Sequence, residues 1–234
     1  MKPSSIQVEF RQQSDPTVAE HSTRFFKTGK GEYAENDRFL GIRVPTIRTF
    51  AQQKKDLATV DILLLLKSEY HEERLLALFL MVNRFERGGQ QEKSEIYKIY
   101  LEHTKYINNW DLVDSSAYQI VGAYLFDKDR RKLRLLSKSS NLWERRMSVI
   151  STYYFIKRDQ YKDTFAISKQ LLGDKEDLIH KAVGWMLREV GNRNREAVET
   201  FLIEHYESMP RTMLRYAIEK FEKEERERFL SGKR

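Results

Sequence analysis

The sequence predicts an all-α fold, a HEAT-like α-solenoid of stacked antiparallel helix pairs with a concave basic face. Helix breakers are scarce, with 10 Gly and 4 Pro in 234 residues, which favours a nearly all-helical chain. The charged fraction of 33% beside an apolar fraction of 40% suits elongated helical proteins with much surface. Helix-pair patterns recur about every 35 to 40 residues, the period of α-solenoids.

We expect one domain over residues 1–234, with N-terminal helices and a loop in 1–58 and helix-pair repeats in 59–234. Within the N-terminal part, residues 1–27 predict two helices. Asp15 is the N-cap of the second, and Pro16 is its first residue. Residues 28–45 are the longest irregular segment, with three glycines and charges of both signs. The glycines lack the spacing and the preceding strand of a phosphate-binding loop. A helix over 46–55 follows.

From residue 59 onwards, apolar periodicity predicts five helix pairs. Their expected ranges are Thr59–Glu69 with His71–Arg87, Gln91–Lys105 with Trp110–Phe126, Asp129–Lys138 with Trp143–Lys157, Gln160–Leu172 with Asp177–Val190, and Arg195–Tyr206 with Arg211–Phe229. Small residues recur in the second helices at intervals of 38, 33, 36 and 33: Ala77, Ser115, Ser148, Gly184 and Ala217. We interpret them as places where neighbouring helices approach closely. The tetratricopeptide signature is missing, so HEAT-like describes the pattern better.

Composition narrows the function classes. The net charge of +7 and the pI near 9.4 favour a polyanionic partner. Cysteine is absent, which excludes disulfides and cysteine-based metal sites. The longest apolar run, Leu75–Val82, is too short to span a bilayer, and the first ten residues have no signal-peptide core. We therefore expect a cytoplasmic protein without a membrane partner.

The second helices of a stacked array line its concave side. Here they carry all three tryptophans, Trp110, Trp143 and Trp185, together with many Arg and Lys residues. One interpretation of these cations is a solvated face with intrahelical ion pairs. The other is a groove that follows a phosphate backbone. Arg145 and Arg146 lie near a helix N-terminus, where a bound anion would offset the unfavourable macrodipole.

Asn109 is predicted to cap a helix in which Trp110 and Asp114 lie one turn apart. An indole beside a carboxylate suits an electron-poor centre, although helix-core packing and capping also explain such a pair. Conventional catalytic motifs are missing, and the five histidines are scattered. We expect these histidines at the surface, and we expect no metal and no cofactor.

Four segments carry a resemblance that covers nearly the whole chain. They are Phe39–Pro45 (FLGIRVP), Asn109–Ser115 (NWDLVDS), Trp143–Arg146 (WERR) and Lys181–Glu189 (KAVGWMLRE). In this order they make the chain similar to the AlkD-type DNA alkylation-repair glycosylases, a HEAT-like all-helical family. The loop at residues 28–38 is longer than the family pattern, and the resemblance assigns it no contact.

The resemblance implies removal of N3- and N7-alkylated purines from duplex DNA without base flipping. It places the catalytic carboxylate on Asp114 and the two tryptophans of the cleft on Trp110 and Trp185. Its DNA-contacting arginine falls on Arg146, with Arg145 beside it. The residues themselves fit this chemistry, because an alkylated purine is already an activated leaving group. An oxocarbenium-like sugar then needs an opposite charge but no second carboxylate acting as general acid.

We add Arg188, Lys157 and Arg43 as candidate DNA-binding residues, and we expect a monomer that binds double-stranded DNA. Two alternatives share the scaffold. A non-catalytic binder of bent or branched DNA would bind such DNA without releasing a base. A protein-binding solenoid would show no preference for DNA over other polyanions.

Overall fold

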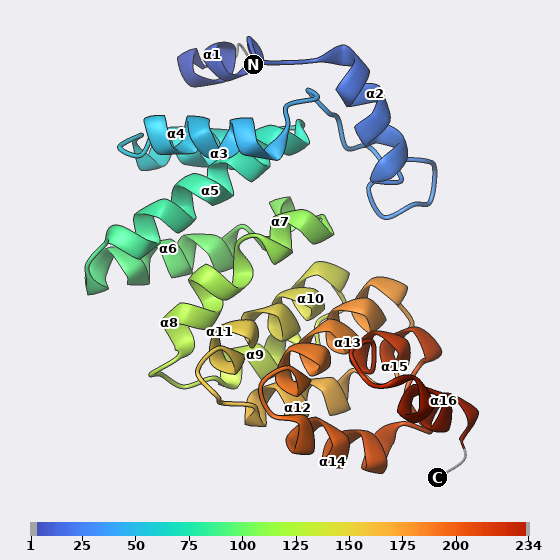
Figure 1. Cartoon of the computed structure of the whole chain (residues 1–234). Helices are drawn as coiled ribbons and strands as arrows, with labels where there is room; N and C mark the ends of the chain where they lie inside the picture. The colour runs from blue at the N-terminus through green and yellow to red at the C-terminus, as the bar shows by residue number, and fades with distance from the viewer. Residues whose placement is uncertain (1–3, 233–234) are drawn as a thin grey trace. The chain divides into compact units, whose positions relative to one another are not determined.

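The computed structural model describes residues 4–232, and the regular elements in that range are helices joined by turns and loops (Figure 1). The β-pairing among these residues is a single isolated bridge between Arg38 and Tyr70. The predicted all-α class is therefore confirmed. The chain divides into two compact units between Ser116 and Ala117. The single domain over residues 1–234 stays a prediction. No helix within residues 4–232 is both long and apolar enough to cross a membrane.

The first unit is built around one buried helix, α5. The helices of this unit are α1 (Ser5–Arg11), α2 (Pro16–Phe25), α3 (Val44–Gln53), α4 (Thr59–Leu66), α5 (His71–Arg87), α6 (Gln90–Glu102), the 3-10 turn η1 (Thr104–Tyr106) and α7 (Trp110–Asp114). Helices α3, α4, α6 and α7 all contact α5. Its first twelve residues are all buried. The predicted start of α2 is confirmed, since the Asp15 side chain accepts hydrogen bonds from two backbone N–H groups and Pro16 follows.

The second unit is built around α13. Its elements are the π-helical turn η2 (Tyr118–Gly122), α8 (Ala123–Leu125), α9 (Arg131–Leu136), α10 (Leu142–Ser151), α11 (Tyr153–Ile156), α12 (Lys162–Gln170), α13 (Asp177–Gly191), α14 (Arg195–His205), α15 (Arg211–Ala217) and α16 (Lys223–Ser231). Helices α10, α11, α12, α14 and α15 pack on α13. A side chain at Gly184 would lie 2.5 Å from the backbone oxygen of Met213. Glycine therefore permits the close approach of α13 and α15, as the small-residue pattern predicted.

Three of the predicted long helices are interrupted. The expected helix Trp143–Lys157 divides at Thr152 into α10 and α11. Local hydrogen bonding explains the other two breaks. The expected helix Trp110–Phe126 stops at Asp114. The hydroxyls of Ser115 and Ser116 donate to the carbonyl oxygens four residues earlier, both at 2.6 Å, and such bonds bend helices. The expected helix Arg211–Phe229 is also wrong as a single element. It ends at Ala217, and α16 begins with its own capping box between Glu222 and Glu225.

Candidate active site

Helix α7 carries the candidate pair Trp110 and Asp114 at its two ends. The predicted N-cap is confirmed: Asn109 has an extended backbone, and its side-chain oxygen accepts the Trp110 backbone N–H at 2.8 Å. Trp110 and Asp114 therefore lie one helical turn apart and share a face. Both are partly exposed, so this face of α7 is accessible to a ligand.

An aromatic group surrounds the Trp110 indole. The Phe26 ring stacks on it with centroids 5.5 Å apart, and the Phe25 ring meets it edge-on at 6.1 Å. The indole N–H donates to the Tyr33 hydroxyl at 3.3 Å. Tyr33 belongs to the 28–38 loop, whose contacts the sequence left open. The loop thus touches the indole directly.

Behind α7, the first turn of α5 consists of four consecutive ionisable residues, His71, Glu72, Glu73 and Arg74, and all four are buried. The expectation that the histidines lie at the surface is wrong for His71, which is 2% exposed. Buried charges are costly unless they are paired and hydrogen-bonded. Each of these four side chains accordingly binds a segment that is distant in sequence.

His71 joins two carboxylates. Its Nε2 lies 2.7 Å from Oδ2 of Asp111 in α7, and its Nδ1 lies 3.5 Å from Oδ2 of Asp37 in the loop. Burial lowers the pKa of His71, but the Asp111 charge and the hydrogen bonds to both carboxylates outweigh burial and raise the pKa to about 9. At neutral pH the imidazole is therefore a cation that donates from both ring nitrogens.

Asp37 ties the 28–38 loop to this cluster. The carboxylate accepts Nη2 of Arg74 at 2.7 Å and, more weakly, the side-chain amides of Asn108 and Asn109 at 3.4 Å each. Burial opposes the charged form, but the hydrogen bond from His71 and the Arg74 charge hold the pKa of Asp37 below its usual range. The loop is consequently anchored to the residues that immediately precede α7.

Glu72 and Glu73 hold the remaining N-terminal segments. Glu72 accepts the backbone N–H groups of Leu40 and Gly41 at 2.9 and 2.8 Å. Glu73 accepts Nε of Arg11, in α1, at 2.6 Å. One helical turn thus organises α1, the loop and α7 at the same time.

The two carboxylates of α7 have different surroundings. Asp111 is bound by the His71 imidazolium. Asp114 lies near the buried Tyr100, whose hydroxyl is 2.8 Å from Oγ of Ser116. Burial, and to a smaller extent the Asp114 charge, raise the pKa of Tyr100, so the phenol stays neutral. Asp111 is therefore engaged in holding α7 against α5, whereas Asp114 lies on the partly exposed face that it shares with Trp110.

The second unit presents an aromatic face with a cation. Tyr118 from η2, Tyr153 from α11 and Trp185 from α13 follow one another, with ring centroids 5.2 and 6.2 Å apart. Nζ of Lys157 lies 4.9 and 4.8 Å from the centroids of the two tyrosine rings. The Trp185 indole N–H donates to Oε1 of Glu189 at 3.0 Å. We call Tyr118, Tyr153, Trp185 and Lys157 the Trp185 face.

Two members of this face were missed by sequence reasoning. Tyr118 and Tyr153 are 35 residues apart, and Trp185 follows Tyr153 after 32. These intervals match the repeat period that the small residues revealed. The same period, applied to aromatic residues, would have selected both tyrosines.

Arg145 and Arg146 are engaged with the chain itself. Nε of Arg145 pairs with Asp174 at 2.6 Å. Arg146 is 5% exposed and donates to the backbone oxygen of Leu178. The predicted N-cap of their helix is confirmed, since Asn141 accepts the Trp143 N–H at 2.9 Å. These two arginines thus fix the start of α10 against the segment that leads into α13.

The other candidate cations differ in exposure. Arg188 pairs with Glu219 and is partly buried. Lys157 and Arg43 are exposed. Of the five predicted DNA contacts, Lys157 and Arg43 therefore present their charges most openly.

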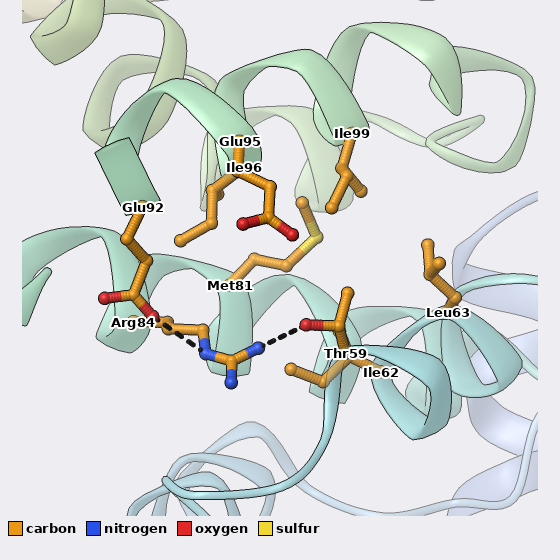
Figure 2. A pocket seen from close by; sticks show the side chains of 9 residues that line it. All are labelled: Thr59, Ile62, Leu63, Met81, Arg84, Glu92, Glu95, Ile96 and Ile99. Carbon is orange, nitrogen blue, oxygen red and sulfur yellow. Dashed lines mark hydrogen bonds and ion pairs between the residues drawn. The ribbon is translucent and has the colours of Figure 1, made fainter. Parts of the chain in front are cut away.

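A cavity of about 90 Å³ between α4, α5 and α6 is lined mostly by aliphatic side chains (Figure 2). Arg84 closes it through Oγ1 of Thr59 at 2.7 Å and Glu92 at 3.1 Å. This space is smaller than a usual ligand pocket. Within residues 4–232, no group of three or more His, Asp or Glu side chains is arranged to hold a metal ion.

Comparison with known proteins gives the family. The model of the DNA alkylation repair enzymes matches residues 6–221. A predicted DNA alkylation repair enzyme from Enterococcus faecalis has a similar structure, with TM-score 0.69, 16% identity, and 90% of this chain and 98% of that chain covered. Smu.31 from Streptococcus mutans UA159 gives 0.50 and 18%, with 92% and 96% covered. These identities show a shared fold alone. No curated protein sequence matches. Because the family model spans nearly the whole chain, this protein belongs to the DNA alkylation repair enzyme family.

Proposed function

We propose that this protein is a DNA glycosylase that hydrolyses the N-glycosidic bond of cationic N3- or N7-alkylated purines in duplex DNA, without flipping the base. The observation that carries the proposal is the pair on α7, with Trp110 and Asp114 one turn apart on a partly exposed face. Family membership supports DNA alkylation repair as the general function.

The reaction makes few demands on the protein. Alkylation leaves the purine positively charged, so the bond from C1′ to the ring nitrogen breaks with its electron pair going to the base, which departs neutral. The positive charge stays on the deoxyribose until water adds to C1′ and loses a proton, as in glycoside hydrolysis. No general acid is needed.

The Asp114 carboxylate stabilises the charge that develops on the sugar and helps to position the water. Asp111 does not compete for this role because His71 binds it. Trp110 packs against the sugar, and its indole face attracts the cationic centre. Trp185 packs against the DNA backbone. The neighbouring aromatic rings of each tryptophan hold it in place.

The exposed Lys157 and Arg43 supply the principal phosphate contacts. Arg188 adds a phosphate contact, because its ion pair with Glu219 is partly exposed to solvent. Arg145 and Arg146 order the N-terminus of α10, whose backbone N–H groups favour an anion. We divide the roles of these cations by their exposure, because a guanidinium that is buried and paired within the protein binds a phosphate less well.

The test is release of free base from a duplex alkylated at N7 of guanine and N3 of adenine. Asp114→Asn should slow release roughly 10²- to 10³-fold, the range for removing one group that stabilises developing charge. Glu102→Gln, an exposed carboxylate of the same unit, is the matched control and should release base at the wild-type rate.

Equal release by wild type and Asp114→Asn would contradict the assigned mechanism. Absence of release by the wild type would contradict the glycosylase itself. Tight, salt-sensitive binding of bent or branched DNA without release would instead indicate the non-catalytic binder.

A further inference from the structure

A charged cluster that the proposed chemistry does not use lies directly behind α7. It consists of His71, Arg74, Asp37 and Asp111, which we call the His71 cluster. The side chains of His71, Arg74 and Asp37 are each at most 5% exposed, and that of Asp111 is 17% exposed. Two cations face two carboxylates, so the charges balance. Such a cluster is costly to bury, and its position suggests what the protein gains from it.

Helix α7 cannot hold its own orientation. It has five residues, whereas isolated helices below about 12 to 15 residues are marginal in water. Contacts with other segments of the first unit must therefore hold α7 in its orientation. Asp111 lies between Trp110 and Asp114 in this helix, and its 2.7 Å contact with His71 fixes the helix to α5.

Further contacts restrain the same helix from the loop side. The amides of Asn108 and Asn109, just before α7, reach Asp37, and the Trp110 indole reaches Tyr33. The His71 ring is itself enclosed by Phe26 and Phe39, with centroids 4.8 and 5.0 Å away. Rotation of α7 would break the bonds to His71 and to the loop together.

We propose that His71 is a positioning residue: through Asp111 and Asp37 it fixes the orientation in which α7 presents Trp110 and Asp114. For catalysis this inference rests on the proposed glycosylase function, because His71 is buried and acts only through α7. A misplacement of about 1 Å in a catalytic group costs on the order of 10²-fold in rate. The expected loss is therefore in kcat, with KM for DNA little changed.

The protonation state of His71 gives this role a pH signature. The charged groups that face it are Asp111 from α7, Asp37 from the loop and Arg74 from its own helix. With a pKa of about 9, the imidazole donates to both carboxylates at neutral pH. Once it loses a proton, one carboxylate loses its donor. The rate of base release should accordingly fall as pH rises through about 9.

The experiment uses the indole N–H signals of the full-length protein, labelled with ¹⁵N at tryptophan. Three tryptophans give three signals, which Trp→Phe variants assign. His71→Leu should shift the Trp110 signal and leave those of Trp143 and Trp185 in place. His71→Gln, which keeps a donor toward Asp111, should restore the Trp110 signal at pH 7. His103→Gln, a histidine of the same unit outside the cluster, should shift none of the three.

Base-release kinetics on the same variants then separate positioning from general damage. His71→Leu should lower kcat by about 10-fold or more with KM within about 2-fold. His71→Gln should recover most of kcat at pH 7 and show no fall near pH 9. Asp111→Asn approaches the same contact from α7 and serves if His71→Leu does not fold.

The proposal is overturned if the Trp110 signal of folded His71→Leu or Asp111→Asn stays at its wild-type position. It is equally overturned if all three signals move together, because the effect of His71 would then extend to Trp143 and Trp185 in the second unit instead of staying with α7. If the wild type releases no base while Trp110 alone moves, the glycosylase function fails and the positioning of α7 stands.

Discussion

The two units set their candidate tryptophans in opposite electrostatic environments. In the first unit, Trp110 stands on a helix anchored by the His71 cluster, where buried positive and negative charges cancel. In the second unit, Trp185 lies next to a pair of tyrosines, and the exposed ammonium group of Lys157 lies over both tyrosine rings. Buried charges that cancel can fix the orientation of a helix, but they do not attract a polyanion. An exposed cation attracts a polyanion but does little to fix the orientation of its neighbours. Charge therefore fixes orientation in the first unit, whereas in the second unit it is placed where it would attract a polyanion.

The largest expected effect is a loss of stability when one carboxylate of the His71 cluster is removed. Asp37→Ala leaves Arg74 and His71 buried with one carboxylate fewer, and removal of one partner from a buried ion pair costs about 3–5 kcal/mol. Glu219→Ala, which removes the exposed partner of Arg188 in the second unit, should cost within about 1 kcal/mol. Urea unfolding monitored by circular dichroism measures both. Similar losses for the two variants would contradict the contrast between the units.

The pH dependence of stability sharpens the same contrast. The pKa of His71 is about 9 in the folded protein and 6.5 as an ordinary value. Its contribution is therefore complete below pH 6.5 and is lost as pH rises through 9, by about 3 kcal/mol from linkage. The depressed pKa of Asp37 acts in the other direction, so its contribution is lost on acidification below its ordinary value of 3.8. Urea titrations from pH 6 to 10 should show the decline in wild type and a flat profile in His71→Gln.

Removing the exposed cation tests the second unit. Lys157→Ala should weaken binding of undamaged duplex several-fold and reduce the slope of log K against log salt by about 0.9, the value for one lost phosphate contact. Lys175→Ala, another exposed lysine of this unit outside the Trp185 face, is the control. Fluorescence anisotropy at several salt concentrations measures the slope. A slope that is the same in Lys157→Ala as in the control would remove Lys157 from the interface.

The smallest effect concerns the loop contact to Trp110. Tyr33→Phe removes the acceptor of the indole N–H and should cost about 1 kcal/mol of stability. The salt slope of DNA binding should stay unchanged, since no charge is altered. Thermal unfolding and anisotropy report the two quantities. A changed salt slope would show that the loop itself contributes to charge recognition.

Much of the fold could be predicted because its signals are local. Apolar periodicity identifies the helix pairs, and Asp15, Asn109 and Asn141 act as caps in the structure as they do in the pattern. The breaks after Asp114 and Ala217 could not be predicted in this way, because helical periodicity continues through them while hydroxyl bonds and a new capping box interrupt the backbone.

The His71 cluster could not be predicted from the sequence for a different reason. His71 lies 34 residues from Asp37 and 40 residues from Asp111, and His-Glu-Glu-Arg at a helix start is equally typical of a solvated first turn. Only the fold brings these partners together. By contrast, Trp110 and Asp114 are four residues apart, so their proximity follows from helix geometry alone.

The first turn of α5 also bears on the order in which the chain is assembled during synthesis. Glu73 binds Gln7 and Arg11 across 66 and 62 residues, and Glu72 binds the backbone of Leu40 across 32. Gln7 and Arg11 therefore leave the ribosome before Glu73, which holds them, is available. Contacts that close such long loops form late. Helices α1 and α2 and the loop after them must wait for α5, with Phe25, which is still 57% exposed in the finished structure, uncovered meanwhile. This delay leaves apolar side chains of the N-terminal segment exposed in the nascent protein, where they favour aggregation.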